Sequence, residues 1–188
     1  CRLRLNSRPL QPAPERSRKT YPAPPAHRPP KGTSNVILFL TDDQGWGDLG
    51  CYGHPRIKSP NLDRFADEGM RFTQCYAACA VCSPSRSAIL TGRTPYRNGV
   101  WRWIPEGSQY HLRQSETSIA RLLREQGYAT CHVGKWHLNG KFNSHDQPQP
   151  DDHGYDWWLA TQNNARPNHI NPTNYVRNRQ ATGKLEGP

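Results

Sequence analysis

The sequence is poor in apolar residues and contains no long hydrophobic run. Hydrophobic residues make up 34% of the 188 residues. When Gly is counted in place of Tyr, the apolar share is roughly 38%, below the roughly 45–50% usual in globular chains. We therefore expect part of the chain to lie outside a packed core. No stretch is long enough for the apolar region of a signal peptide or for a membrane span, so no span is predicted.

Acidic residues are also scarce, and the resulting charge is uneven. The chain has 25 Lys and Arg against 15 Asp and Glu, a formal charge of +10 at pH 7. Residues 1–33 hold eight of those basic residues, eight of the 18 Pro and only Glu15, which leaves +3 for residues 34–188. A Pro- and Arg-rich segment with so few apolar side chains cannot offset the entropy lost on ordering. We expect residues 1–33 to be a disordered tail and expect no nucleic-acid partner.

Two further absences concern the compartment. The chain contains no Asn-x-Ser/Thr sequon, and it begins at Cys1 rather than at Met. We interpret the start as that of a fragment or of a mispredicted chain. The compartment is therefore unknown from this end of the sequence.

Paired cysteine motifs are few. Cys79-Ala-Val-Cys82 is one C-x-x-C, the pattern that thiol redox enzymes place at a helix N-terminus, so a redox function stays open. A second pair with zinc-ligand spacing is missing, which argues against zinc. The anion loop of a cysteine phosphatase needs more residues than the three between Cys82 and Arg86.

What the sequence does contain is an alternation of strand-like and helix-like stretches, typical of an α/β architecture. In the loop that follows the second predicted strand, Ser83 is a suitable N-cap, Pro84 a suitable first helical residue and Gly92 a suitable end. Cys82 would then lie at a helix N-terminus, which favours an anionic group. Ser115 is the expected cap of a later helix. The predicted strands are 34–41, 70–76 and 128–134, and the predicted helices are 59–69, 83–92 and 115–127.

Polar side chains follow two of the predicted strands. Asp42 and Asp43 come directly after the first strand, and Lys135 and His137 come after the last one. Ligands of α/β sheets bind outside the carboxyl ends of the strands, so we expect the two pairs to meet if their strands are parallel. Lys135 and His137 share one side if the extended backbone continues. Two carboxylates on a turning chain favour Ca²⁺ or Mg²⁺, although solvated loop aspartates would give the same pattern.

Five motifs carry a resemblance to a known family. They are Asn35–Leu49, Ser59–Asp63, Cys82–Arg93, Gly134–His137 and His153–Asp156. In order and spacing they resemble the N-terminal part of the type I sulfatases, among them the arylsulfatases and N-acetylgalactosamine-6-sulfatase-like enzymes. The combination of Cys-x-Pro-Ser-Arg with Gly-Lys-Trp-His is the most specific part. The resemblance covers about residues 34–160.

The resemblance implies an alkaline-phosphatase-like α/β fold, a mixed sheet flanked by helices, and hydrolysis of sulfate esters. It implies that a formylglycine-generating enzyme oxidises Cys82 to Cα-formylglycine, whose hydrated form attacks sulfur with one hydroxyl and expels sulfate through the other. Asp42 and Asp43, with an oxygen of the modified Cys82, would hold Ca²⁺, or Mg²⁺ in its place. The cation would polarise the sulfate.

The resemblance also assigns roles to three further side chains. Arg86 would place a fixed positive charge near the diol and the metal-bound oxygens. Lys135 would bind a sulfate oxygen and offset the charge that develops in the transition state. His137 would hydrogen-bond the diol and accept its proton during elimination.

The family pattern is incomplete within the chain. A further Asp-Asn pair for the metal and a further His and Lys for the sulfate have no convincing counterpart before Pro188. We therefore interpret residues 34–188 as a truncated N-terminal part of a catalytic domain, and an inactive fragment or a phosphohydrolase of the same superfamily stays an alternative. The implied substrate is a sulfated small molecule or glycan. By resemblance the protein would be exported to the periplasm, the extracellular space or the lysosome.

Overall fold

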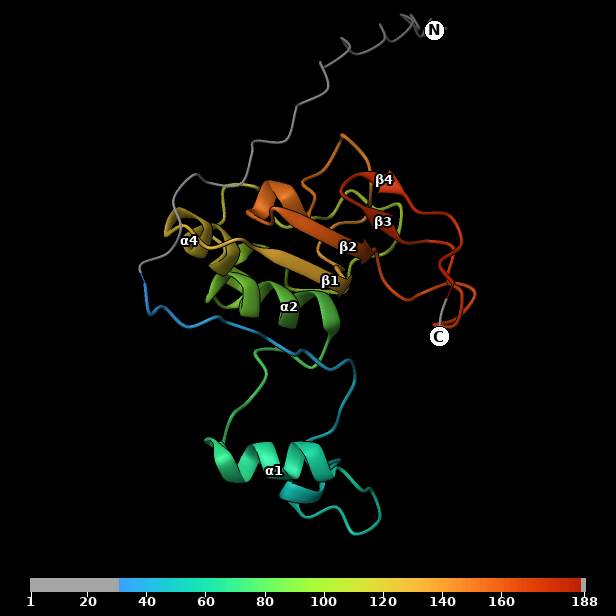
Figure 1. Ribbon diagram of the computed structural model, residues 1–188. Coiled ribbons are helices and arrows are strands. Elements are labelled where there is room, and N and C mark those ends of the chain that lie inside the picture. The colour runs from blue at the N-terminus through green and yellow to red at the C-terminus, as the bar shows by residue number, and fades with distance from the viewer. Residues whose placement is uncertain (1–30, 187–188) are drawn as a thin grey trace, which may run out of the picture.

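The structure is a computed structural model that describes residues 31–186 (Figure 1). Most of the predicted tail, residues 1–30, lies outside the described residues, and residues 31–33 are exposed. None of the helices in the described part of the chain combines the length and the apolar character needed to cross a bilayer.

A four-stranded mixed sheet forms the centre of the body. β1 (Cys131–Lys135) pairs in parallel with β2 (Trp157–Thr161). β3 (Val176–Arg177) and β4 (Gln180–Ala181) extend the sheet in antiparallel pairings, in the order β1-β2-β3-β4. The pairing of Lys135 with Thr161 brings the carboxyl ends of β1 and β2 to the same edge. The mixed sheet with its helices agrees with the predicted α/β class.

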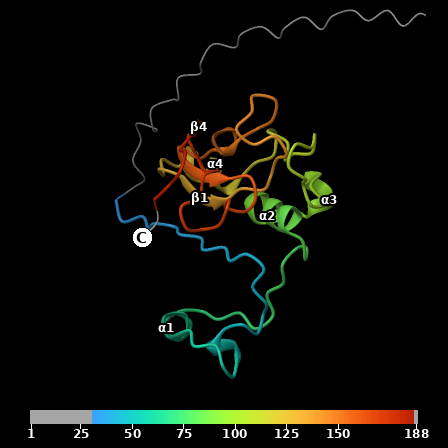
Figure 2. The ribbon, with the colours of Figure 1, turned by 90° about the vertical axis from the view of Figure 1, so that its right-hand side faces the viewer.

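The helices that matter for the site pack beside β1. α2 (Cys82–Thr91) lies along β1, and α4 (Ile119–Glu125) lies near its amino end (Figures 1 and 2). Two short elements complete the body, α3 (Pro95–Asn98) after α2 and the 3-10 helix η2 (Pro150–His153) before β2. The core between these elements consists of apolar side chains, with Phe142 and Tyr155 packed against them: Leu90, Val100, Ile104, Leu112, Trp136, Leu138, Trp158, Ala160 and Val176.

α2 ends as predicted but begins earlier. Gly92 closes the helix in the left-handed conformation, φ 64°, with its N–H bonded to the Ala88 carbonyl, because glycine adopts a positive φ without steric cost. The prediction that Ser83 is the N-cap is wrong, since the helix begins at Cys82. The Ser83 hydroxyl instead accepts the Ile104 N–H at 3.2 Å, so a tertiary contact uses the oxygen that a cap would need.

The cap of α4 also differs from the prediction. Ser118, not Ser115, precedes the helix and accepts the Arg121 N–H at 3.0 Å. Glu116 does not lie in the first turn but is buried, and its carboxylate binds the side chains of Arg93 and Arg113. Two serines three residues apart look alike in sequence, but Ser115 is exposed, whereas Ser118 is buried and its hydroxyl also donates to the His153 carbonyl.

The helix predicted over 59–69 is present as α1 (Pro60–Glu68), with Pro60 in its first turn. Asp63 of α1 accepts bonds from the Ser59 hydroxyl at 2.8 Å and from the Cys51 N–H at 2.7 Å, which ties α1 to the 3-10 helix η1 (Gly50–Tyr52). Both views show this pair apart from the sheet (Figures 1 and 2).

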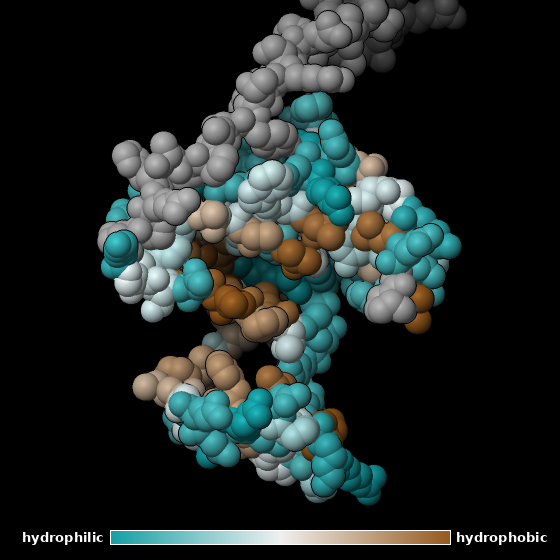
Figure 3. All heavy atoms as spheres, in the orientation of Figure 1, coloured by the Kyte–Doolittle hydropathy of each residue, from teal (hydrophilic) through white to brown (hydrophobic). Residues whose placement is uncertain are grey.

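Two predicted strands are absent. Residues 34–41 and 70–76 form no ladder within the described residues, with a bend at 73–74, and the predicted strand 128–134 is shifted to 131–135. Segment 34–41 was predicted to be buried on both faces, yet Phe39 is 89% exposed. Its alternate side chains Val36, Leu38 and Leu40 face the body across a cavity of about 480 Å³ that β1, α2 and α4 line on the other side. Figure 3 shows apolar side chains gathered around this recess. The cavity separates the segment from the free edge of β1, so no ladder forms.

Candidate active site

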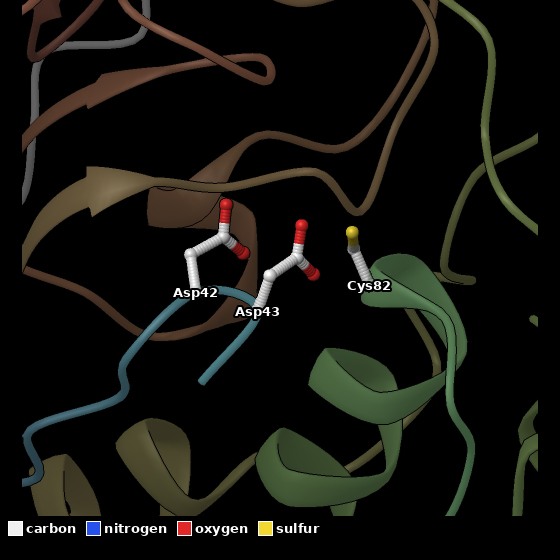
Figure 4. Close-up of side chains that lie close together, drawn as sticks. All are labelled: Asp42, Asp43 and Cys82. Carbon is white, nitrogen blue, oxygen red and sulfur yellow. The ribbon is translucent and has the colours of Figure 1, made fainter. Parts of the chain in front are cut away.

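Three side chains predicted as metal ligands lie together at the N-terminus of α2 (Figure 4). Cys82 is the first residue of the helix, and one ligand atom of each of Asp42, Asp43 and Cys82 lies within 4.8 Å of the other two. Asp43 adopts a left-handed φ of 53°. Because the chain turns there, the two adjacent carboxylates do not alternate as they would on a strand, and both lie beside the sulfur (Figure 4).

Two cations surround this group. Lys135, the last residue of β1, places Nζ 2.9 Å from Asp42 Oδ2 and 3.4 Å from Cys82 Sγ. Arg86, one helical turn beyond Cys82, donates at 2.9 Å to Asp42 Oδ1 and at 2.9 Å to the Lys135 carbonyl. Both cationic side chains are only 12% exposed, so their charges are held in place. The predicted meeting of Asp42 with Lys135 is present, across 93 residues of sequence.

The cations change the acidity of Asp42. Partial burial raises the pKa of this carboxyl, but the hydrogen bonds and positive charges of Lys135 and Arg86 outweigh it and hold the pKa below its usual value. Asp42 is therefore ionised over the whole neutral range. Two carboxylates and two cations thus lie around one sulfur atom, and the two cations already hold one anionic group, Asp42, between them.

The extended backbone on which His137 would share a side with Lys135 does not continue. β1 ends at Lys135, His137 has a left-handed φ of 55°, and its ring is buried. The ring Nε2 lies 3.1 Å from the Ile104 carbonyl; because a carbonyl only accepts, Nε2 carries the hydrogen. Nδ1 is then an unprotonated, buried nitrogen with no partner among the described residues.

The charge state of His137 follows from its surroundings. Burial lowers the pKa of the imidazole to about 4, and the positive charges of Lys135 and Arg86 act in the same direction. The hydrogen bond to Ile104 and the charge of Asp42 oppose the shift. At neutral pH the ring is uncharged, and its free Nδ1 can accept a proton.

The donor set at the three clustered residues fits a hard divalent cation in part. Asp42 and Asp43 supply carboxylate oxygens, which Ca²⁺ and Mg²⁺ prefer. The Cys82 sulfur is a soft ligand that these ions do not favour, whereas an oxygen at the same position would fit them. Asp42 and Asp43 thus fit such a cation, and Cys82 as a thiol does not.

One neighbour of the site was not predicted from the sequence. The Trp103 ring lies edge-on to the His137 ring, with centroids 5.3 Å apart and planes at 83°. The only signal was Trp101-Arg-Trp103, an aromatic-rich stretch without helical or strand period. The contact depends on the inward turn of His137, which no local pattern indicates.

Comparison with known proteins places these residues in a family. A model of the sulfatase family matches residues 34–184. N-acetylgalactosamine-6-sulfatase of Canis lupus familiaris is 43% identical over 150 residues, covering 71% of this chain and 28% of the relative. Steryl-sulfatase of Mus musculus is 41% identical over 176 residues, covering 89% of this chain and 26% of the relative. The chain thus spans little more than a quarter of the length of these relatives.

Solved structures give the same result for the fold. A protein crystallised in complex with its substrate D-glucosamine-2-N,6-O-disulfate matches with a TM-score of 0.62 and 31% identity, covering 86% of this chain and 28% of that chain. The structural neighbours are sulfatases with the alkaline-phosphatase-like fold, which confirms the fold expected from the motifs. From the family match over most of its length and from its relatives, this chain belongs to the sulfatase family.

Proposed function

We propose that the protein containing this chain is a sulfuric ester hydrolase, and that residues 34–188 form the N-terminal part of its catalytic domain. The observation that carries the proposal is the position of Cys82. It begins α2 beside two carboxylates and lies 3.4 Å from the Lys135 ammonium. A nucleophile precursor, an anion-binding cation and hard metal ligands are thereby within reach of one sulfate group.

Cys82 would act after oxidation to Cα-formylglycine by a formylglycine-generating enzyme. Hydrated to a geminal diol, this residue supplies one hydroxyl that attacks the sulfur and releases the alcohol, and a second whose collapse to the aldehyde breaks the C–O bond to sulfate. The partly exposed position of Cys82 at the helix end supports access for a substrate. The N-terminal end of α2 favours the negative charge that the reaction places there.

The chain's own cations would bind and orient the ester. Lys135 would hold a sulfate oxygen, since its ammonium already lies near both Asp42 and Cys82. Arg86 would keep Asp42 and the end of β1 in register through its two hydrogen bonds. Both groups are in place before substrate arrives, so little reorganisation is needed when negative charge develops.

His137 would accept the proton released during elimination of sulfate. Its neutral ring and free Nδ1 support this role, and the Ile104 carbonyl fixes the tautomer. Asp42 and Asp43, with an oxygen at residue 82, would hold Ca²⁺, with Mg²⁺ as a substitute. Such a cation neutralises charge on the sulfate oxygens when it is bound.

The substrate we propose is a sulfated sugar or glycan. One relative is named for N-acetylgalactosamine 6-sulfate, and one structural neighbour was solved with a sulfated glucosamine as its substrate. The steryl-sulfatase similarity leaves the sulfate ester of an apolar alcohol, a sterol, as the competing substrate. Export to the periplasm, the extracellular space or the lysosome is proposed on the same family basis.

Two other functions are separable from this one. A thiol redox role would require Cys79 and Cys82 to form a disulfide, and both are free in the structure. A phosphohydrolase of the same superfamily would use the same metal ligands, but it would favour phosphate over sulfate esters.

An assay on paired substrates tests the proposal. The protein is produced together with a formylglycine-generating enzyme and supplied with Ca²⁺ and equal concentrations of 4-nitrophenyl sulfate and 4-nitrophenyl phosphate. We expect sulfate release to dominate and to disappear in Lys135→Ala, with Lys141→Ala as the matched control. Faster phosphate release would favour the phosphohydrolase. The 188-residue chain by itself is expected to be weakly active or inactive, because it spans so little of its relatives.

A further inference from the structure

Trp103 precedes Ile104, whose backbone is hydrogen-bonded both to the residue after Cys82 and to His137. Its neighbour Ile104 donates its N–H to the Ser83 hydroxyl at 3.2 Å, directly beside Cys82. The carbonyl of Ile104 accepts from His137 Nε2 at 3.1 Å. Ile104 itself is 1% exposed. The backbone next to Trp103 is therefore fixed by the helix that carries Cys82 and by the proposed proton acceptor.

The Trp103 ring has an open surface at this fixed position. It is 43% exposed, and its aromatic neighbour among the described residues is His137, whose ring meets it edge-on. Trp101, two residues earlier, differs because the Arg102 guanidinium lies 5.2 Å from the centre of its ring. Within residues 31–186, no Lys or Arg is stacked on Trp103. Rigid indole surface thus remains beside the site for a ligand.

A sulfated sugar presents two surfaces of different chemistry, and the site offers a partner for each. Its sulfate group suits the ammonium of Lys135 and the guanidinium of Arg86. The C–H face of its pyranose ring is apolar and flat, and a Trp ring is a large, rigid contact for such a face that costs little conformational entropy. Ligand sites commonly combine aromatic walls with a few fixed polar groups in this way.

We propose that Trp103 is a specificity-determining residue, the platform on which the pyranose ring bearing the sulfate ester stacks. The inference rests on the proposed sulfatase function and extends it to the carbon skeleton of the substrate. Trp103 performs no chemistry. It selects sugar sulfates over sulfates without a ring by contact with the sugar alone.

Binding measurements separate the ring from the sulfate. The protein, with Cys82 left unconverted so that ligands are not consumed, is titrated in Ca²⁺ with galactose 6-sulfate, phenyl sulfate and ethyl sulfate, and affinities are read by ligand-observed NMR. In Trp103→Ala the affinity for galactose 6-sulfate should fall about tenfold, equivalent to about 1.4 kcal/mol, while that for ethyl sulfate changes by less than about twofold. Trp103→Phe should retain part of the preference for the sugar.

The controls make each outcome decisive. Trp157→Ala removes a similarly exposed ring, 57% exposed, from the opposite end of β2 and should change neither affinity. Near-ultraviolet circular dichroism of Trp103→Ala and Trp103→Phe confirms that both remain folded. An unchanged affinity for galactose 6-sulfate in Trp103→Ala, or a loss confined to phenyl sulfate, would overturn the inference and leave the proposed function intact. Failure of the unaltered protein to bind any of the three sulfates would overturn both.

Discussion

The candidate site joins two regions of very different structural support. Cys82 and Arg86 lie on α2, whose Leu90 belongs to the core, and Lys135 ends β1, which is held by its backbone pairing with β2. Asp42 and Asp43 lie on an extended segment with exposed apolar side chains and no ladder within the described residues. We call these the packed half and the extended half.

Ion pairs, rather than backbone hydrogen bonds of a sheet, hold the extended half against the packed half at the site. The described contacts between the two halves at the site are the ion pairs of Asp42 with Lys135 and with Arg86, both at 2.9 Å. On the packed half, backbone and apolar contacts set the positions of the reactive groups. On the extended half, the Asp42 carboxylate anchors the segment that carries both proposed metal ligands. The structure of this half should therefore be the more sensitive to a single change of charge.

The largest expected effect concerns the chemistry of the packed half. Cys82→Ala removes the nucleophile precursor, and the rate of sulfate release should fall by roughly 10⁴-fold or more. The measurement is the initial rate with 4-nitrophenyl sulfate. Cys75→Ala, which alters an exposed cysteine outside both halves, should leave the rate unchanged. If Cys82→Ala keeps more than a tenth of the original rate, Cys82 is not the precursor of the nucleophile.

Acid sensitivity should come from the packed body beside β1 rather than from the extended half. His153 of η2 is buried against the Trp136 ring, and burial, followed by the charge of Arg121, lowers its pKa from 6.5 to about 4. The unfolded chain binds this proton more readily, so His153 alone should lower the free energy of unfolding by up to about 3 kcal/mol as the pH drops from 6.5 towards 4. Segment 34–49 contains no His.

Urea unfolding at pH 7 and pH 4, followed by tryptophan fluorescence, measures this dependence. His153→Phe keeps an aromatic ring beside Trp136 and should lose that part of the pH dependence. His145→Phe, at an exposed position, should not. Equal pH dependence in the two variants would contradict the assignment to His153.

The extended half is tested by Asp42→Asn. The substitution removes a negatively charged ligand and also the carboxylate that Lys135 and Arg86 share. The affinity for Ca²⁺ should therefore fall by about 10–100-fold. Calorimetric titration with Ca²⁺ gives the value. Asp67→Asn makes the same charge change on exposed α1 and should have little effect. If both variants bind Ca²⁺ as the unaltered protein does, the extended half does not contribute to a metal site.

The smallest expected effect separates the stability of the protein from metal binding by the extended half. Ser118→Ala removes the α4 cap, and the free energy of unfolding should fall by about 1–2 kcal/mol, while Ca²⁺ affinity stays the same. Ser115→Ala, the exposed serine favoured by the sequence, should be within about 0.5 kcal/mol of the unaltered protein. Reversal of the two values would restore Ser115 as the cap.

The sequence predicted those features that depend on the backbone preference of a single residue. Pro60 and Gly92 fix a helix start and a helix end through their backbone preferences, and both predictions are confirmed. The prediction of a strand at 34–41 was wrong because strand pairing depends on a partner far away in the chain, and an apolar run does not specify that partner. The meeting of Asp42 with Lys135 was expected from two parallel strands; it is present although 34–41 forms no ladder, and an ion pair joins the two side chains.

The remaining parts of the site depended on single backbone angles. His137 was expected on the side of Lys135 only if the extended backbone continued, but the backbone takes a left-handed φ there, and no residue pattern indicates a positive φ at a histidine. The contact with Trp103 follows from that turn. Ser118 rather than Ser115 is the cap, and its hydroxyl also bonds the His153 carbonyl, 35 positions away in the chain, which no local pattern indicates.

The mass of one peptide tests the central claim that Cys82 is the precursor of the nucleophile. The protein is made together with a formylglycine-generating enzyme, alkylated and digested with trypsin, and the Phe72–Arg86 peptide is weighed. Our account predicts alkylation of Cys75 and Cys79 alone, with residue 82 converted by loss of H₂S and gain of one oxygen and reactive towards a hydrazine. An alkylated Cys82, or a Cys79–Cys82 disulfide, would contradict it.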